Sequence, residues 1–461
     1  MQYSIQNNRA SGSRCVMANQ SAQEIDTRTL ILLALSATAG VAVEFYDFTI
    51  FGYAAASAFP QIFFPNLPPA QALVFSYLAY GAGYPARLFG AFIFGHYGDR
   101  VGRKCAFLTN LIVVGLSTCL TGMLPGYAKL GVAAPALLVL LRVIQGIALG
   151  GEFGGATSLL AEFAAYRRSR AFWISIANLG LALGLMAGSF TFLALRNTFA
   201  ESGWRVAMLL SAVIVIPALL ARYRLADSPL FESLKSREER SRAPSFEVFR
   251  KHARPLILLA IVSAFQIMDS VVTGTYIVSF MRLAGIPLAT TAVIIFLSRI
   301  ADVLGVLVTG PLADMLRRRK LAYAAIGIST ALSYPFALAI YGKQVLLVGV
   351  LQFLIVLFGM GLLHGLVPIL TAESFPTKFR YSGSGISFNL AGVLGGMIAP
   401  PVLAKLIGSD VRHNWIYVPL VYSVYCAAAM IALLFIRETR DVRFEDLDVT
   451  ARIGIPSSGG D

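Results

Sequence analysis

Long runs of apolar residues recur along the whole chain and are separated by short polar segments. Most runs hold about 20 residues or more, which lets a helix cross a hydrocarbon layer of about 30 Å. The runs are continuous, whereas strands of a membrane β-barrel alternate polar and apolar residues. The pattern therefore predicts twelve membrane-spanning helices, at roughly residues 30–59, 72–96, 105–124, 135–163, 171–195, 204–222, 254–281, 288–313, 321–341, 344–371, 381–407 and 414–436.

The composition excludes a soluble globular protein. Of the 461 residues, 57% are hydrophobic and only 13% are charged, whereas about 25% of residues are charged in soluble domains. The four cysteines show no paired spacing, so neither a disulfide framework nor a zinc site is indicated. The sequence shows no nucleotide-binding loop and no nucleophile motif. We therefore expect no enzyme activity, no cofactor and no bound metal.

The distribution of basic residues predicts the topology. The 38 Lys and Arg residues exceed the 24 Asp and Glu residues by 14, an excess that would suggest nucleic-acid binding in a soluble chain. Here 28 basic residues lie in the termini and alternate loops, seven in the opposite loops and three inside spans. Cytoplasmic loops carry the excess of Lys and Arg. We therefore expect a bacterial inner (plasma) membrane protein with both termini in the cytoplasm, in contact with lipids and not with nucleic acid.

A hydrophilic segment near the middle of the chain divides it into two halves of six spans. The predicted units are a cytoplasmic tail (1–29), a first half (30–222), a cytoplasmic loop (223–253), a second half (254–436) and a second cytoplasmic tail (437–461). An internal repeat supports an all-α membrane fold with two pseudo-symmetric six-helix bundles, as in transporters that rock one half against the other. Residues of the first half recur 211 positions later: Ala161, Glu162, Asn178, Leu179, Gly184 and Met186 as Ala372, Glu373, Asn389, Leu390, Gly395 and Met397.

The loop after the second span carries a specific signature. Residues 95–104 read GHYGDRVGRK, which resembles the G-x-x-x-D-R-x-G-R-K signature of the major facilitator superfamily at every defined position. The segments EFYDF (44–48), residues 142–155 and ESFPT (373–377) resemble the metabolite:proton symporter branch of that superfamily. This resemblance covers residues 30–436. It implies the superfamily's fold and proton-driven transport of organic acids such as α-ketoglutarate, shikimate and citrate, or of zwitterions such as proline and betaine.

The same loop is expected to act as a conformational latch rather than to bind substrate. The carboxylate of Asp99 can cap a helix N-terminus across the interface between the halves and can pair with Arg103. The basic residues also face the anionic leaflet and orient the protein. The segment GPLADMLRRRK (310–320) echoes this loop in the second half. The latch candidates are Gly95, Asp99, Arg100, Gly102, Arg103 and Lys104, and the secondary candidates include Asp314 and Glu373.

Ionisable residues inside the spans are the main candidates for chemistry. Each costs about 2.5–3.5 kcal/mol on insertion scales, so those retained normally face a cavity and have a partner. They are Glu44, Asp47, Arg87, Arg142 and Glu152 in the first half, and Asp269, Arg299, Asp302 and His364 in the second.

Proton coupling is assigned to Asp47 first, and then to Glu44 and Glu152. Glu44 and Asp47 are three residues apart, so they lie on one helical face, and two carboxylates in a dry site favour binding of a shared proton. The alternative is a fixed ion pair with Arg142 or Arg87. A substrate anion that competed for the arginine would free the carboxylate, and substrate and proton would then bind together. Glu152 lies among glycines, so the alternative to a proton-coupling role is that this segment serves close helix packing.

Substrate binding is assigned to three arginines and four uncharged residues. Arg142 can hold a carboxylate through two hydrogen bonds, or can form an ion pair that joins its helix to the first span. Arg87 is either a substrate contact or a gate, and Arg299 either a second clamp or a partner of Asp302 on its own helix. Each of the uncharged residues either contacts substrate or only packs helices together. His364 is either a proton relay or a buried neutral histidine. The uncharged candidates are Tyr46, Asn178, Tyr276 and Asn389.

These features together predict a proton-coupled symporter, expected to be a monomer, that imports a small mono-, di- or tricarboxylate by alternating access. The intramembrane arginines favour an acid. The alternatives are a symporter of a zwitterionic osmolyte or amino-acid derivative, an exporter of the same fold and a transporter-like receptor.

Overall fold

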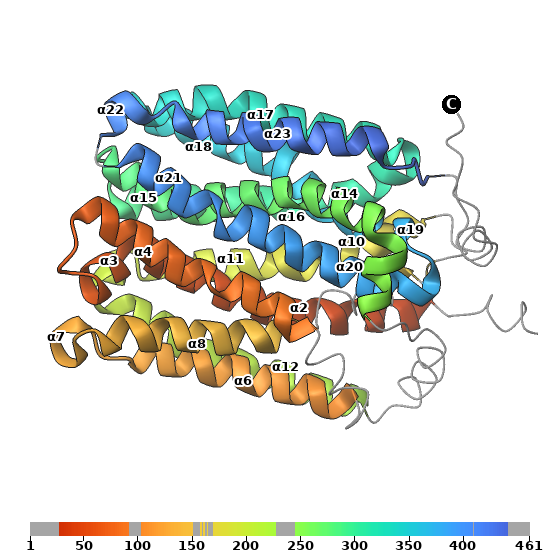
Figure 1. The fold of residues 1–461 in the computed structure, drawn as a ribbon, viewed down its shortest axis with the longest axis horizontal. Helices are drawn as coiled ribbons and strands as arrows, with labels where there is room; N and C mark the ends of the chain where they lie inside the picture. Colours follow the sequence, from red (N-terminus) through yellow and green to blue (C-terminus); the bar gives the residue numbers. More distant parts are fainter. Residues whose placement is uncertain are drawn as a thin grey trace, which may run out of the picture.

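The computed structural model describes residues 27–91, 103–150, 157, 158, 160, 161, 164, 169–226, 245–408 and 410–440. Within these residues all regular secondary structure is helical, and the long helices lie side by side in one bundle (Figure 1). The first helix begins and the last helix ends at the same end of the bundle. We call this the terminal end, and the other the opposite end.

The first half supplies six spans. Its helices are α2 (Thr27–Ser57), α3 (Phe59–Phe63), α4 (Pro69–Gly81), α6 (Arg103–Met123), α7 (Tyr127–Leu130), α8 (Ala133–Leu149), α10 (Arg170–Ile176), α11 (Leu179–Ala194), the π-helix η1 (Phe199–Gly203) and α12 (Trp204–Ala226). The helix of the second span continues to residue 91 after a turn at Ala82. The short α3 and α7 lie in the connections at the opposite end (Figure 1).

The second half supplies the other six spans. Its elements are α14 (Ser245–Val271), η3 (Val272–Tyr276), α15 (Ile277–Leu283), α16 (Leu288–Met315), α17 (Arg318–Tyr341), α18 (Val345–Ile355), η4 (Val356–Gly361), α19 (Leu362–Ser374), α20 (Thr377–Ala391), η5 (Gly392–Met397), α21 (Ala399–Ile407), α22 (Val411–Asn414) and α23 (Tyr417–Phe435). Helices α17, α18 and α23 lie farthest from α6, α8 and α12 (Figure 1).

These helices confirm the predicted all-α membrane fold, and twelve spans account for them. Eight helices of the described chain are individually long and apolar enough to cross a membrane, and Thr109–Met123 and Ala133–Leu149 are shorter apolar helices. Among the described boundaries, one differs from its predicted position by more than four residues. Helix α14 begins at Ser245, nine residues before the predicted start of its span, so part of the predicted loop is helical. Its backbone leaves helical geometry at His252, close to Pro255, which lacks the N–H of a regular helical hydrogen bond.

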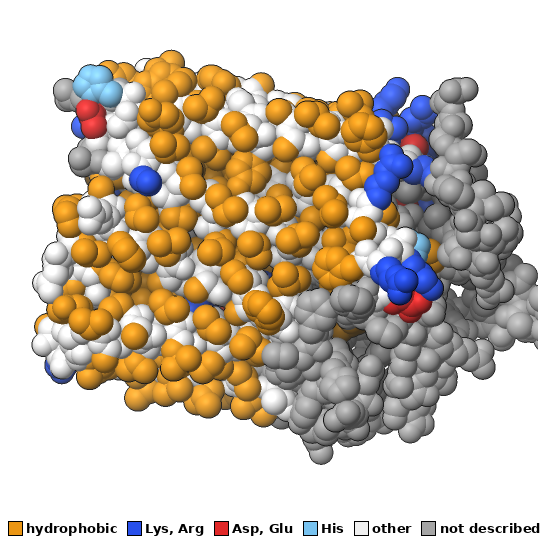
Figure 2. Space-filling view, in the orientation of Figure 1, with side chains coloured by type: hydrophobic (Ala, Val, Ile, Leu, Met, Phe, Trp, Pro, Cys, Tyr) orange, Lys and Arg blue, Asp and Glu red, His pale blue; other side chains and the backbone are white. Residues whose placement is uncertain are grey.

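The outer surface of the bundle suits contact with lipid. Large apolar side chains point outward along the spans, among them Phe89 with 65% exposed, Val213 with 61% and Leu434 with 62%. Figure 2 shows hydrophobic side chains across the middle of the visible face and basic side chains gathered near the terminal end. A soluble protein would rarely expose so wide an apolar surface.

Close packing between α2 and α11 joins the first and fifth spans. Gly180 lies against the backbone of Thr38. A Cβ atom at position 180 would stand 2.9 Å from the carbonyl carbon of Thr38, which is closer than packed atoms tolerate. The absence of a side chain at this position therefore sets the distance between these helices.

We expect Gly180→Ala to lower the free energy of unfolding by about 1–3 kcal/mol, because an added methyl forces two backbones apart. The measurement is the Tm of the purified protein by tryptophan fluorescence. Gly327→Ala is the matched control, since a Cβ there would meet only Met430 Cε at 3.7 Å. A Tm for Gly180→Ala at or above that of Gly327→Ala would contradict the close approach.

Candidate functional site

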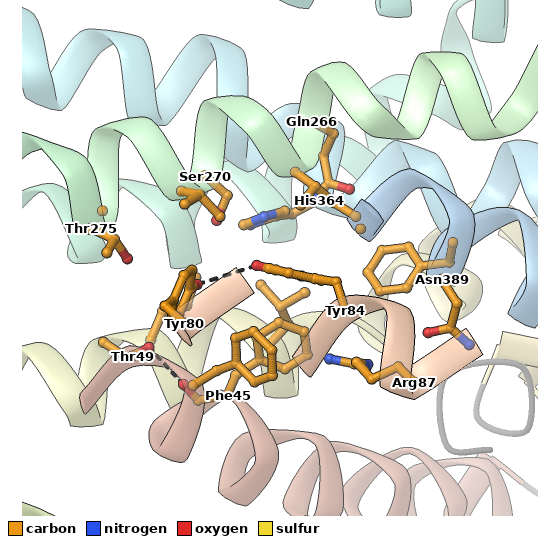
Figure 3. Close-up of a pocket in the computed structure, with 18 of the residues that line it drawn as sticks. Phe45, Thr49, Tyr80, Tyr84, Arg87, Gln266, Ser270, Thr275, His364 and Asn389 are labelled. Carbon is orange, nitrogen blue, oxygen red and sulfur yellow. Dashed lines mark hydrogen bonds between the residues drawn. The ribbon is translucent and has the colours of Figure 1, made fainter. Parts of the chain in front are cut away.

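A cavity lies between the two halves of the bundle. Nine of its 20 lining residues come from the first half and eleven from the second. Figure 3 shows Phe45, Tyr80 and Arg87 on one side of it, facing Gln266 and His364 on the other. Because both halves contribute walls, rocking one half against the other would change access to whatever the cavity holds.

The lining of the cavity is basic and rich in hydrogen-bonding groups. Arg87, Arg299 and His364 line it, and no Asp or Glu is among the described residues of its wall. The hydroxyl groups of Tyr80 and Tyr84 lie 3.2 Å apart at its surface. Guanidinium groups in a dry cavity bind anions such as carboxylates. The uncharged polar residues of the wall are Thr49, Tyr53, Tyr80, Tyr84, Gln266, Ser270, Thr275 and Asn389.

Glu44 and Arg87 form a buried ion pair at the wall of the cavity. Arg87 Nη2 contacts Glu44 Oε1, and the two side chains are 4% and 3% exposed. The guanidinium carbon of Arg87 also lies 5.4 Å from the centre of the Phe48 ring. Glu44 therefore reaches the cavity through Arg87, and an anion bound to Arg87 would compete with this carboxylate.

Asp47 is buried inside the first half, away from the cavity. Ser211 of α12 donates a hydrogen bond to Asp47 Oδ1. Thr118 of α6 lies with its hydroxyl 2.9 Å from Asp47 Oδ2 and equally close to the carbonyl of Val114, so its single hydrogen goes to one of the two. No Lys or Arg forms an ion pair with Asp47 in the part of the chain that is described.

Asp47 is linked to Arg142 through neutral side chains. Gln145 Nε2 donates to Thr118 Oγ1 at 2.8 Å, and Arg142 Nη1 donates to Gln145 Oε1 at 2.6 Å. Neither of the predicted direct pairs, Arg142 with Asp47 or with Glu44, is present among the described ion pairs. The amide and the hydroxyl instead bridge the two charged groups.

Arg142 lies behind an aromatic wall rather than in the cavity lining. Its guanidinium carbon is 3.8 Å from the ring centre of Phe48 and 4.4 Å from that of Phe51, and its Nε donates to the Tyr80 carbonyl at 3.2 Å. Phe48 and Tyr80 themselves line the cavity. Arg142 Nη2 is buried without a hydrogen-bond partner in the described chain. Phe48 and Tyr80 therefore separate this donor from the cavity.

A second charged group lies in the second half. Arg299 Nη1 is 3.9 Å from Asp302 Oδ2, and Asp302 Oδ1 is 2.8 Å from His364 Nδ1. All three side chains are at most 1% exposed. Gly274 leaves room for the arginine, because a Cβ there would collide with Arg299 Nη2. The predicted pairing of Arg299 with Asp302 is thus present, and Arg299 also lines the cavity.

Two asparagines related by the repeat tie the halves together. Asn178 Nδ2 donates to the His364 carbonyl at 2.9 Å, and Asn389 Nδ2 donates to the Gly150 carbonyl at 3.1 Å. Each amide therefore bonds to the backbone of the other half. Asn389 lines the cavity, whereas Asn178 does not appear in its wall.

The two tyrosines predicted to bind substrate also lie outside the wall. Tyr46 donates its hydroxyl hydrogen to the Ala207 carbonyl at 2.9 Å, and so faces α12. Tyr276 packs between the rings of Tyr77 and Phe280, with ring centres 5.8 and 6.2 Å away. Both positions are typical of helix packing.

A cluster of charges joins the halves at the terminal end. Asp314, at the end of α16, accepts hydrogen bonds from the backbone N–H groups of Ala171 at 3.1 Å and Phe172 at 3.4 Å. Arg170 of α10 pairs with Glu373 of α19 at 2.7 Å, and Arg318 pairs with the same carboxylate at 3.2 Å. Asp314 therefore caps a helix across the interface in the way expected of Asp99.

Other contacts join the halves at the opposite end. The hydroxyl groups of Tyr77 and Ser279 are 2.7 Å apart, and Arg282 Nη1 donates to the Ser57 carbonyl at 2.8 Å. The described residues thus connect the halves on both sides of the cavity. Opening either side requires breaking these bonds and separating the helices that pack there.

Some predicted residues lie outside the described part of the chain. They are Gly95, Asp99, Arg100, Gly102 and Glu152. Arg103 and Lys104 begin α6, and only their backbone is described. Their roles as latch or proton carrier stay predictions.

Sequence reasoning missed the uncharged polar residues that connect the charges. Thr118, Gln145 and Ser211 surround Asp47, and Gln266 and Ser270 line the cavity. Their signal was an amide or hydroxyl inside an apolar span, which is common and becomes informative only once its neighbours are known.

The comparisons with known proteins agree with this architecture. The model of the Major Facilitator Superfamily matches residues 37–400. The chain is 37% identical to the "Inner membrane metabolite transport protein YhjE" of Escherichia coli, over 90% of this chain and 96% of that protein. It is 31% identical to the "Shikimate transporter" of the same species, over 87% and 93% of the two chains.

Solved structures share the fold. The proton:xylose symporter XylE, bound to 6-bromo-6-deoxy-D-glucose, superposes with a TM-score of 0.64 over 92% of this chain and 99% of that chain, at 16% identity. The family match, the two relatives and the shared fold lead to one conclusion: the protein is a membrane transporter that belongs to the major facilitator superfamily.

Proposed function

We propose that the protein is a proton-coupled symporter that imports a small organic acid. The observation that carries this proposal is the charge of the cavity, in which Arg87, Arg299 and His364 face a space with no carboxylate in its described wall. A zwitterionic osmolyte would need an acidic partner for its cationic group, so the wall favours an acid. The hydroxyl and amide groups around it suit a substrate with its own hydroxyl or carbonyl groups.

Coupling follows from competition for the guanidinium groups. A substrate carboxylate that binds Arg87 shares this guanidinium with Glu44, so the buried groups of the first half gain an unmatched negative charge. A proton then neutralises this charge, because an unpaired charge is costly in a dry site. We place this proton on Asp47, because its hydroxyl partners Ser211 and Thr118 are neutral, whereas Glu44 pairs with Arg87. The loaded protein then carries substrate and proton together.

Alternating access would exchange the contacts at the two ends. Release of the terminal end requires loss of the Asp314 cap and of the Arg170–Glu373 pair, while the opposite end keeps the Tyr77–Ser279 and Arg282–Ser57 contacts. The excess of Lys and Arg near the terminal end supports a cytoplasmic location for that end. We infer a monomer in the inner membrane, with import as the direction of transport.

The uptake assay that tests the function uses purified protein in proteoliposomes. We expect one labelled acid among shikimate, α-ketoglutarate and citrate to accumulate when an inward proton gradient is applied, and a protonophore to abolish the accumulation. Proline and betaine test the zwitterion alternative, and liposomes without protein are the control. Accumulation of proline or betaine alone would reject the acid. Uptake that an inward sodium gradient drives and the protonophore leaves unchanged would reject proton coupling.

Arg299→Gln should weaken substrate binding by roughly 10- to 150-fold in Kd, because a hydrogen bond to a charged group contributes about 1.5–3 kcal/mol. Asp302 keeps His364 as a partner in this variant, so the remaining charge is not left alone. The measurement is the Kd of the acid found by the uptake assay. Lys405→Gln is the control, because Lys405 is exposed in the last turn of α21. Equal Kd values for the two variants would remove Arg299 from the site.

Asp47→Asn should abolish uphill accumulation while substrate exchange across the membrane continues, because the carrier loses the proton that links its two conformations. The amide can still bond to Ser211 and Thr118, so packing is largely kept. The readouts are gradient-driven uptake and counterflow of the same acid. Asp410→Asn, at an exposed position near the opposite end, is the control. Normal accumulation by Asp47→Asn would exclude Asp47 from coupling.

A further inference from the structure

Each half of the protein buries one carboxylate in the same kind of setting. In the first half, Asp47 of α2 lies between hydroxyl groups of α6 and α12. In the second half, Asp269 of α14 accepts hydrogen bonds from Ser329 of α17 and from Tyr422 of α23, both at 2.7 Å. Asp269 is fully buried and is not part of the cavity wall.

The hydroxyl donors occupy equivalent positions in the two halves. Ser329 lies 211 residues after Thr118, and Tyr422 lies 211 residues after Ser211, which is the offset that relates Asn178 to Asn389. Asp47 stands ten residues before Ser57, the end of its span, and Asp269 stands fourteen residues before Leu283. The carboxylates thus differ by about one helical turn of 3.6 residues. The arrangement of one carboxylate and two hydroxyls is duplicated with the fold.

Asp269 has no cation in contact within the described chain. The ionisable groups that face it are Tyr422 of α23, His364 of α19 and Arg299 of α16. The other charged residues of α17, α19, α20 and α21 lie in the first or last turns of these helices, α23 has none, and those of α14 itself precede Pro255. Ser329 and Tyr422 can donate hydrogen bonds, but they cannot cancel a full charge.

The two halves differ in the balance between their buried carboxylates and guanidinium groups. The buried carboxylates Glu44 and Asp47 are matched by two guanidinium groups, Arg87 and Arg142. In the second half, Asp269 and Asp302 share one guanidinium, that of Arg299. A net negative charge in a dry interior costs several kcal/mol. Neutrality of this group therefore requires one more proton, on Asp269, Asp302 or His364.

The hydrogen-bond geometry points to Asp269 as the place for that proton. Asp302 has two nitrogen partners that can each donate to its ionised form, with Oδ1 2.8 Å from His364 Nδ1 and Oδ2 3.9 Å from Arg299 Nη1. Asp269 has only neutral donors. Met360 Sδ lies 3.6 Å from Thr273 Oγ1 and 3.4 Å from Arg299 Nη1, so this side chain packs both against the segment that follows Asp269 and against an arginine of the cavity wall.

We propose that Asp269 forms a second proton-binding site, so that each half of the transporter carries one exchangeable proton. This inference rests on the proposed proton-coupled function and extends it from one half to both. Loss of an acid anion from Arg299 strengthens the Arg299–Asp302 pair, and binding of the anion weakens it. The protonation of Asp269 thereby responds to the occupancy of the cavity.

Infrared difference spectroscopy of the full-length protein in liposomes tests the site with protons as the only probe. A pH step should remove the C=O bands of protonated buried carboxyls from the wild-type spectrum. Asp269→Asn should remove one component and Asp47→Asn a different one. A spectrum of Asp269→Asn that superimposes on that of the wild type would overturn the second site.

Two further variants keep the test valid if Asp269→Asn does not fold. Ser329→Ala and Tyr422→Phe leave the carboxyl in place and remove a donor to its charged form, so the pH midpoint of its band should rise. Ser333→Ala is the matched control, because its hydroxyl bonds only to the Thr330 carbonyl of its own helix. A carboxyl that acts only as a fixed acceptor would show no pH-dependent band in any of these variants.

The failure of this inference can be told apart from that of the proposed function. The infrared experiment needs no transported substrate, whereas the function fails if the wild type accumulates no acid under a proton gradient. For the acid that accumulates, the proton-to-substrate ratio from reversal potentials should fall by a single proton in Asp269→Asn. An unchanged ratio with normal proton-driven uptake would contradict the second site alone.

Discussion

Ionised side chains inside a membrane bundle need opposite charges or hydrogen-bond donors, because neither lipid nor packed helices can solvate them. This constraint explains most of the polar structure of the protein. Glu44 is held by Arg87, and Asp302 by His364 and Arg299. In the proposed mechanism, a substrate anion competes with these carboxylates for the guanidinium groups of Arg87 and Arg299. Under the proposed function, the electrostatic requirement that stabilises these pairs would also make proton uptake and anion binding depend on each other.

The internal repeat gives both halves the same arrangement of helices, but some equivalent positions carry different side chains. Hydroxyl groups at positions 118 and 329, and at positions 211 and 422, approach a buried carboxylate in each half. The repeat does not extend to Arg142, because Phe353 stands 211 residues later. The charges behind the cavity wall therefore differ between the halves, although each half contributes one arginine to the wall itself.

Much of the fold could be predicted from the sequence, and less of the site. Apolar length and the count of basic residues predicted twelve helices, and the repeat located the paired asparagines. The sequence could not predict which way each helix faces, because a span that is apolar all round has no amphipathic side to orient it. Arg142 was therefore expected in the cavity, yet it lies behind Phe48 and Phe51. Tyr46 was likewise expected there, and it faces α12.

The contacts at the two ends differ in kind, and this difference decides how the halves can move. At the terminal end the halves are joined by ionised groups, the Asp314 cap and the Arg170–Glu373 pair. At the opposite end they are joined by neutral hydroxyls and by one arginine that bonds to a backbone carbonyl. Water that enters the terminal end screens its charges and replaces its bonds at little cost. The free energy needed to separate the halves at that end thus falls as water enters. The contacts there are therefore suited to two states, one closed and one open.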